Sequence, residues 1–104
     1  MGQLWDIRAA PWRAMLYAAK CFWPGVTEDD LRLAAERAGS EPGADQRPRF
    51  VGLLHLPGDE LALALFEADS PLEVKRASEA AGMPCERVIA TVWVAPETRG
   101  GLLR

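Results

Sequence analysis

The sequence predicts one small α+β domain in which strands and helices follow one another in the order β-α-β-β-α-β. Four apolar runs of strand length are separated by turn residues, and two intervening segments repeat their apolar residues at helical spacing. Each of those two segments also begins with a helix N-cap signal. At 104 residues, the chain has room for one such domain with a single modest core.

The first run, residues 14–23, predicts a strand with alternating side chains. One face of it would carry Met15, Tyr17, Ala19 and Cys21. A helix should follow, because Thr27 can serve as N-cap and Asp30, three residues later, completes an acidic variant of the capping box. Its expected buried stripe is Leu31, Ala34, Ala35 and Ala38. Gly39 is the expected C-cap.

A β-hairpin is predicted from residues 49–56 and 61–67, because the turn-forming residues 57–60 lie between these two apolar runs. A hairpin makes the second and third strands antiparallel neighbours in the sheet.

The second helix has the clearest start in the chain. Ser70 is the expected N-cap, followed by Pro71 at the first helical position and Glu73 at the third. Gly82 is expected to close this helix. The β-branched residues 87–94 then predict the last strand.

This order is the split βαβ, or ferredoxin-like, pattern: a four-stranded antiparallel sheet with two helices on one face. Right-handed crossovers would place the first and third strands in the centre. The expected domain covers residues 14–95, with an irregular N-terminal arm over 1–13 and a C-terminal tail over 96–104.

Both faces of the predicted sheet are apolar, although two helices can cover only one. The third strand alternates Leu61, Leu63 and Leu65 with Ala62, Ala64 and Phe66. The second is expected to place Phe50 and Leu54 opposite Val51, Leu53 and His55, and the last to place Ile89 and Trp93 opposite Val88, Val92 and Val94. An identical chain packed sheet to sheet is the simplest cover, so we expect a homodimer. Trp5 and Trp12 of the arm are the alternative source of cover.

Charge and composition argue against several classes of function. The chain has 12 basic and 15 acidic residues, and the basic ones are dispersed, which is not typical of a nucleic-acid-binding surface. No apolar stretch reaches the ~20 residues of a membrane-spanning helix. Residues 1–10 lack the apolar core of a signal peptide, so we expect a cytoplasmic protein. Cys21 and Cys85 fit no CxxC motif and are expected to be unpaired.

Four side chains are candidates for a ligand-binding site: Tyr17, Cys21, His55 and Glu67. His55, Glu67 and Tyr17 are also the candidate catalytic residues, with His55 expected on the partner-facing side of the sheet as a base. Glu67 would be a base if it points inward, and otherwise a solvated carboxylate pairing with Arg87. His55 and the Cys21 thiolate are the candidate metal ligands. For each side chain an ordinary structural role is the alternative.

Three stretches resemble a known family. They are Trp23-Pro24-Gly25-Val26-Thr27 at the first helix, Leu65-Phe66-Glu67-Ala68 followed by Ser70-Pro71, and Gly82-Met83-Pro84 followed by Arg87-Val88. Together they resemble the small ferredoxin-like proteins of the nickel-binding or unknown-function family, of the dimeric α+β barrel type. The resemblance implies a dimer and a nickel site. Some relatives carry a histidine in the second helix where this chain has Ala77, and a tyrosine or phenylalanine where it has His55.

These observations leave three hypotheses for function. The first is a dimeric ferredoxin-like protein that binds a metal ion, such as nickel, or a small apolar ligand. The second is a cofactor-independent monooxygenase or cyclase of the dimeric α+β barrel type, which would work by positioning its substrate in an apolar cleft. The third is a protein-interaction module without a ligand.

Overall fold

The computed structural model describes residues 15–40, 46–94 and 96. In chain order the elements are β1 (Met15–Phe22), α1 (Glu28–Gly39), β2 (Arg49–Leu56), the short 3₁₀ turn η2 (Pro57–Asp59), β3 (Leu61–Ala68), α2 (Pro71–Ala80) and β4 (Cys85–Thr91). The expected arm, with Trp5 and Trp12, and all of the expected tail except Pro96 lie outside the described residues.

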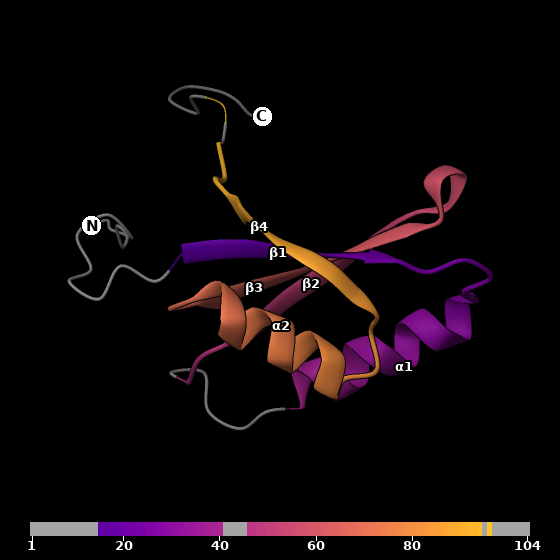
Figure 1. Cartoon of the computed structure of the whole chain (residues 1–104), viewed down its shortest axis with the longest axis horizontal. Helices are drawn as coiled ribbons and strands as arrows, with labels where there is room; N and C mark the ends of the chain where they lie inside the picture. Colours follow the sequence, from indigo (N-terminus) through magenta and orange to yellow (C-terminus); the bar gives the residue numbers. More distant parts are fainter. Residues whose placement is uncertain (1–14, 41–45, 95, 97–104) are drawn as a thin grey trace.

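The four strands form one antiparallel sheet in the order β2-β3-β1-β4, and both helices lie on the same side of it (Figure 1). The first and third strands are central, as right-handed crossovers require. The predicted ferredoxin-like α+β fold is therefore confirmed, and one face of the sheet carries no helix.

Both helices begin where the sequence predicts, because their caps satisfy backbone N–H groups that the first turn leaves free. At α1, the Thr27 hydroxyl accepts from the Asp30 N–H and the Asp30 carboxylate accepts from the Thr27 N–H, each at 3.0 Å. At α2, the Ser70 hydroxyl accepts from the Glu73 N–H at 3.3 Å. The Glu73 carboxylate accepts from the N–H of Asp69, one residue before the cap.

The helix ends differ from each other. Gly82 follows α2 with φ of 88°, the left-handed conformation that glycine adopts without strain. The prediction that Gly39 caps α1 is wrong: Gly39 is the last helical residue and Ser40 is the C-cap. The Ser40 N–H and hydroxyl both donate to the Arg37 carbonyl, so this turn is closed without a left-handed residue.

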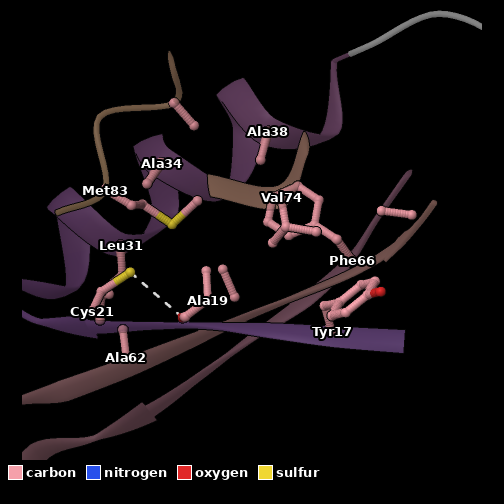
Figure 2. Close-up of a cluster of buried hydrophobic side chains, with 13 residues drawn as sticks. Tyr17, Ala19, Cys21, Leu31, Ala34, Ala38, Ala62, Phe66, Val74 and Met83 are labelled. Carbon is pink, nitrogen blue, oxygen red and sulfur yellow. Dashed lines mark hydrogen bonds between the residues drawn. The ribbon is translucent and has the colours of Figure 1, made fainter. Parts of the chain in front are cut away.

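The core lies between the sheet and the helices, and small side chains dominate its sheet side (Figure 2). The fully buried residues there include Ala19, Cys21, Ala62, Ala64 and Ala68. The larger buried side chains are Phe66 from β3, Val74 from α2 and Met83 from the segment after α2. Alanine on the strands lets these three fill the space beneath the helices at close packing.

Two strand predictions needed correction. The second strand has a register shift between Phe50 and Gly52, so Phe50 faces the helices and packs edge-on against Phe66 with ring centroids 5.4 Å apart, whereas Leu54 lies on the open face. The expected placement of Phe50 and Leu54 on one face is therefore wrong, because a bulge shifts the alternation by one residue.

The last strand is also displaced from its predicted position. It covers Cys85–Thr91 instead of residues 87–94. Thr91 pairs with Leu16, one residue from the start of β1, so the β-branched residues that follow reach past the described end of their neighbour. Strand propensity without a partner strand is not sufficient to extend the sheet.

Candidate functional site

Tyr17 and Cys21 are on the helix-facing side of β1 and belong to the core. The Cys21 thiol is fully buried. Its sulfur lies 3.5 Å from the Ala19 carbonyl oxygen (Figure 2) and 3.7 Å from the Ser78 hydroxyl. Burial raises the pKa of the Cys21 thiol to about 11, against the smaller opposing effect of the Ser78 hydrogen bond. At neutral pH this thiol is protonated and inaccessible, which disfavours thiolate chemistry.

His55 lies on the same side of the sheet as the helices, opposite Ala62, but it is exposed. The bulge in β2 thus removes it from the open, partner-facing side where the sequence pattern placed it. Ala62 also pairs with Cys21, so His55 and Cys21 are two strands apart, about 10 Å between backbones. The described residues contain no group of three or more histidine, cysteine, aspartate or glutamate side chains able to hold a metal ion.

Glu67 is on the open face of the sheet, opposite Leu16. Its carboxylate accepts from Arg49 on the neighbouring strand, at 2.8 Å from Nε and 2.7 Å from Nη2. Arg87, which was expected to pair with Glu67, lies instead on β4, opposite Lys20 of β1. Glu67 and Tyr17 therefore face opposite sides of the sheet, and the three candidate catalytic residues do not converge on one cavity.

The open face of the sheet is mostly apolar. By register it carries Leu16, Ala18, Phe22, Leu54, Leu56, Leu61, Leu63, Leu65 and Ile89. Several of these are large and well exposed, including Leu54 at 53% and Phe22 at 50%. The Arg49–Glu67 pair lies at one end of this face, whereas Lys20, opposite Leu63 on β3 and Arg87 on β4, lies within it, between Ala18 and Phe22.

A cleft of about 380 Å³ opens on the helix side of the molecule. It lies between the last turn of α1, the segment before β2 and one side of α2. Its buried floor is made by Ala38, Phe66 and Ala81, of which the first two are labelled in Figure 2. The rest of the lining is Arg37, Gln46, Arg47, Pro48, Glu73, Arg76, Ala77 and Ala80.

Three arginines and one glutamate give this cleft a positive charge, although the whole chain carries a formal charge of -3. Sequence reasoning missed this group. Arg37, Arg47 and Arg76 belong to three different segments, and no spacing rule links them before the fold is known. The only available signal was the basic character of the residues just before the second strand.

Comparison with known proteins gives no match to a family model, to a curated protein or to a solved structure. The resemblance to a nickel-binding family therefore stays a prediction. Among the described helices, neither has the length and apolar character needed to cross a membrane.

Proposed function

We propose that this chain is a small-ligand-binding protein that acts as a homodimer. The observation that carries the ligand-binding part is the cleft between α1 and α2. Its volume of about 380 Å³ falls in the ~300–1,000 Å³ range of small-molecule sites. It also combines a buried apolar floor with charged side chains at the rim, the usual composition of a site that holds and orients a small molecule.

The dimeric part is supported by the size and composition of the open sheet face. Four strands ~4.8 Å apart and about 25 Å long give a flat area of about 500 Å² before the relief of the side chains is counted. This is of the order of the ~800 Å² of accessible surface that each partner contributes to a stable interface. Most of this face is apolar, with leucines on β2 and β3 beside Leu16, Ala18 and Phe22 of β1, and Lys20 and Arg87 are the charged side chains that a second copy would have to accommodate.

Dimerisation and ligand binding are compatible because they use opposite faces. A second copy packed on the open face leaves the helix side accessible. The proposal includes a reducing, cytoplasmic location, which the two free thiols of Cys21 and Cys85 favour.

The ligand-binding part is tested by NMR with a set of neutral and charged aromatic fragments. We expect saturable shifts of backbone amides at residues 37–38, 46–47 and 73–81, which line the cleft. Absence of any saturable shift in this region would remove the ligand-binding function and leave an interaction module.

The dimeric part is tested by measuring the mass in solution over a range of concentrations. We expect a dimer for the parent chain and a monomer for Leu54→Lys, because a charge would be buried at the interface. Leu33→Lys is the matched control: Leu33 is a leucine on α1 of similar exposure, 45% against 53%, and should leave the dimer intact. A parent chain that stays monomeric at high concentration would contradict the proposal.

Nothing in the described residues favours the metal-binding or enzyme forms of the function. A nickel site on His55 and Cys21 would need both side chains at one ion, and Cys21 is fully buried. The enzyme hypothesis needs Tyr17, His55 and Glu67 around one substrate, and Glu67 is on the opposite face.

A further inference from the structure

The cleft between the helices brings together three guanidinium groups above a buried apolar floor. We propose that it binds a small organic anion, a carboxylate or phosphate monoester attached to a compact apolar group. The anionic end would contact Arg37 and Arg76, and the apolar end would rest on Ala38, Phe66 and Ala81. This inference rests on the proposed ligand-binding function and names its ligand class.

Arg37 and Arg76 approach the cleft from different helices. Arg37 belongs to the last turn of α1, and Arg76 to the middle of α2. Within the described residues, neither guanidinium forms an ion pair. Elsewhere arginines of this chain do hold carboxylates: Arg32 contacts Asp29 at 3.0 Å, and Arg49 contacts Glu67 at 2.7 Å. Among the described residues, the two arginines at the cleft therefore have no carboxylate partner.

The one acidic side chain in the lining is already engaged. Glu73 accepts a hydrogen bond from the Asp69 N–H at 3.1 Å and so helps to close the first turn of α2. Its position near the helix N-terminus also favours negative charge there. It therefore has a structural reason to be present in a site that otherwise attracts anions.

The side chain of Arg37 passes close to a glycine. A Cβ atom at Gly82 would lie 3.1 Å from Nη1 of Arg37, closer than most such contacts. The guanidinium of Arg37 therefore lies beside the turn that follows α2. Arginine suits this role because its planar fork of donors matches the oxygens of a carboxylate or phosphate.

The floor selects against a bare inorganic ion. Ala38, Phe66 and Ala81 are buried and apolar, and with the partly buried Ala77 they offer contact area but no hydrogen bonds from side chains. A ligand that fills the cleft gains from burying apolar surface as well as from its charge. The chain as a whole is acidic, so binding of anions would depend on these residues and not on a general positive field.

The test measures the affinities of benzoate, phenyl phosphate and neutral benzyl alcohol by NMR titration of the full chain. We expect both anions to bind with shifts at residues 37–38 and 73–81, and benzyl alcohol to bind at least tenfold more weakly. The ratio of benzoate to phenyl phosphate affinity decides between a carboxylate and a phosphate ligand. Affinity for both anions should fall as salt is added.

Five variants assign the effect to the cleft. Arg37→Gln and Arg76→Gln should each weaken anion binding about tenfold, the effect of losing one charge-assisted hydrogen bond. Arg32→Gln, on the same helix as Arg37 but outside the cleft, should leave it unchanged. Arg37→Lys and Arg76→Lys keep the charge and guard against misfolding; each should retain part of the affinity.

The outcomes separate this inference from the function it rests on. Equal binding of benzyl alcohol and benzoate in the cleft, or equal loss in Arg32→Gln and Arg76→Gln, would overturn the anion assignment and leave ligand binding standing. Absence of binding by all three compounds would overturn both.

Discussion

The two faces of the sheet are built from the same four strands but differ in the size of their apolar side chains. Beneath the helices, the central strands present mainly alanine, together with Cys21, Tyr17 and Phe66. On the open side β3 presents three leucines, and β1 presents Leu16 and Phe22 together with Ala18 and Lys20. Hydrophobicity alone therefore does not distinguish a covered face from an uncovered one. Side-chain size does, because a helix can approach a sheet closely only where the strands leave room for its own side chains.

The largest effect should come from removing the one large aromatic side chain buried on β3. Phe66→Ala is expected to cost about 3–5 kcal/mol of unfolding free energy, since it removes a packed ring and leaves a cavity. Leu54→Ala, on the open face, should cost less than about 1 kcal/mol when measured on dilute, monomeric protein. Urea unfolding gives both values. Similar losses of unfolding free energy in the two variants would show that Leu54 is as buried as Phe66 in the monomer.

A pair of enlargements sharpens the same comparison. Ala64→Leu should destabilise the fold by about 1–3 kcal/mol, because Ala64 is fully buried against the helices and an added side chain has no space. Leu54→Phe, which enlarges a half-exposed side chain on the open face, should be tolerated. Thermal unfolding of the two variants is sufficient, and a larger loss in Leu54→Phe would contradict the assignment of faces.

Stability should also fall at high pH through the Cys21 thiol. The folded pKa of about 11 lies above the unfolded value of 9.0, so the folded protein holds this proton to higher pH. The contribution is therefore fully present below pH 9.0 and is lost as pH rises toward about 11, by up to roughly 2 kcal/mol. Comparing the pH slopes of urea unfolding for the parent and Cys21→Ala isolates this effect from other groups. Identical slopes would show that burial does not raise the thiol pKa.

The smallest effect concerns a helix start on the covered side. Ser70→Ala should cost about 1 kcal/mol, because the Glu73 N–H loses its acceptor at the α2 N-terminus. Ser70→Asp keeps an acceptor oxygen and is expected to restore most of the loss. Denaturant unfolding measures both, and no recovery in the aspartate variant would mean that Ser70 acts by something other than capping.

The sequence was sufficient for the features that depend on local rules. Short-range spacing is enough to predict the N-terminal caps of the two helices at Thr27 and Ser70, the hairpin, and the alternation of side chains along β1 and β3. The predictions that were wrong concern features that depend on a neighbouring strand. The bulge near Gly52 depends on the pairing of β2 with β3, and the end of β4 depends on its pairing with β1.

The same limit applies to the sites. His55 moved to the other face because one bulge reverses the alternation, and Glu67 took Arg49 as partner because the hairpin register places them opposite each other. Arg37 and Arg76 meet only after two helices pack on one sheet. None of these neighbours is encoded in local spacing.

Leu65 and Phe66 are consecutive residues of β3, and their side chains lie on opposite faces of the sheet. Leu65 belongs to the open face, while the ring of Phe66 forms part of the cleft floor. A ligand that shifts Phe66 would thus act on the same backbone that presents Leu65 to a second copy. Thermodynamic reciprocity then requires that ligand and subunit affinities change by the same factor. The dimer dissociation constant measured with and without saturating benzoate would give the size of that coupling.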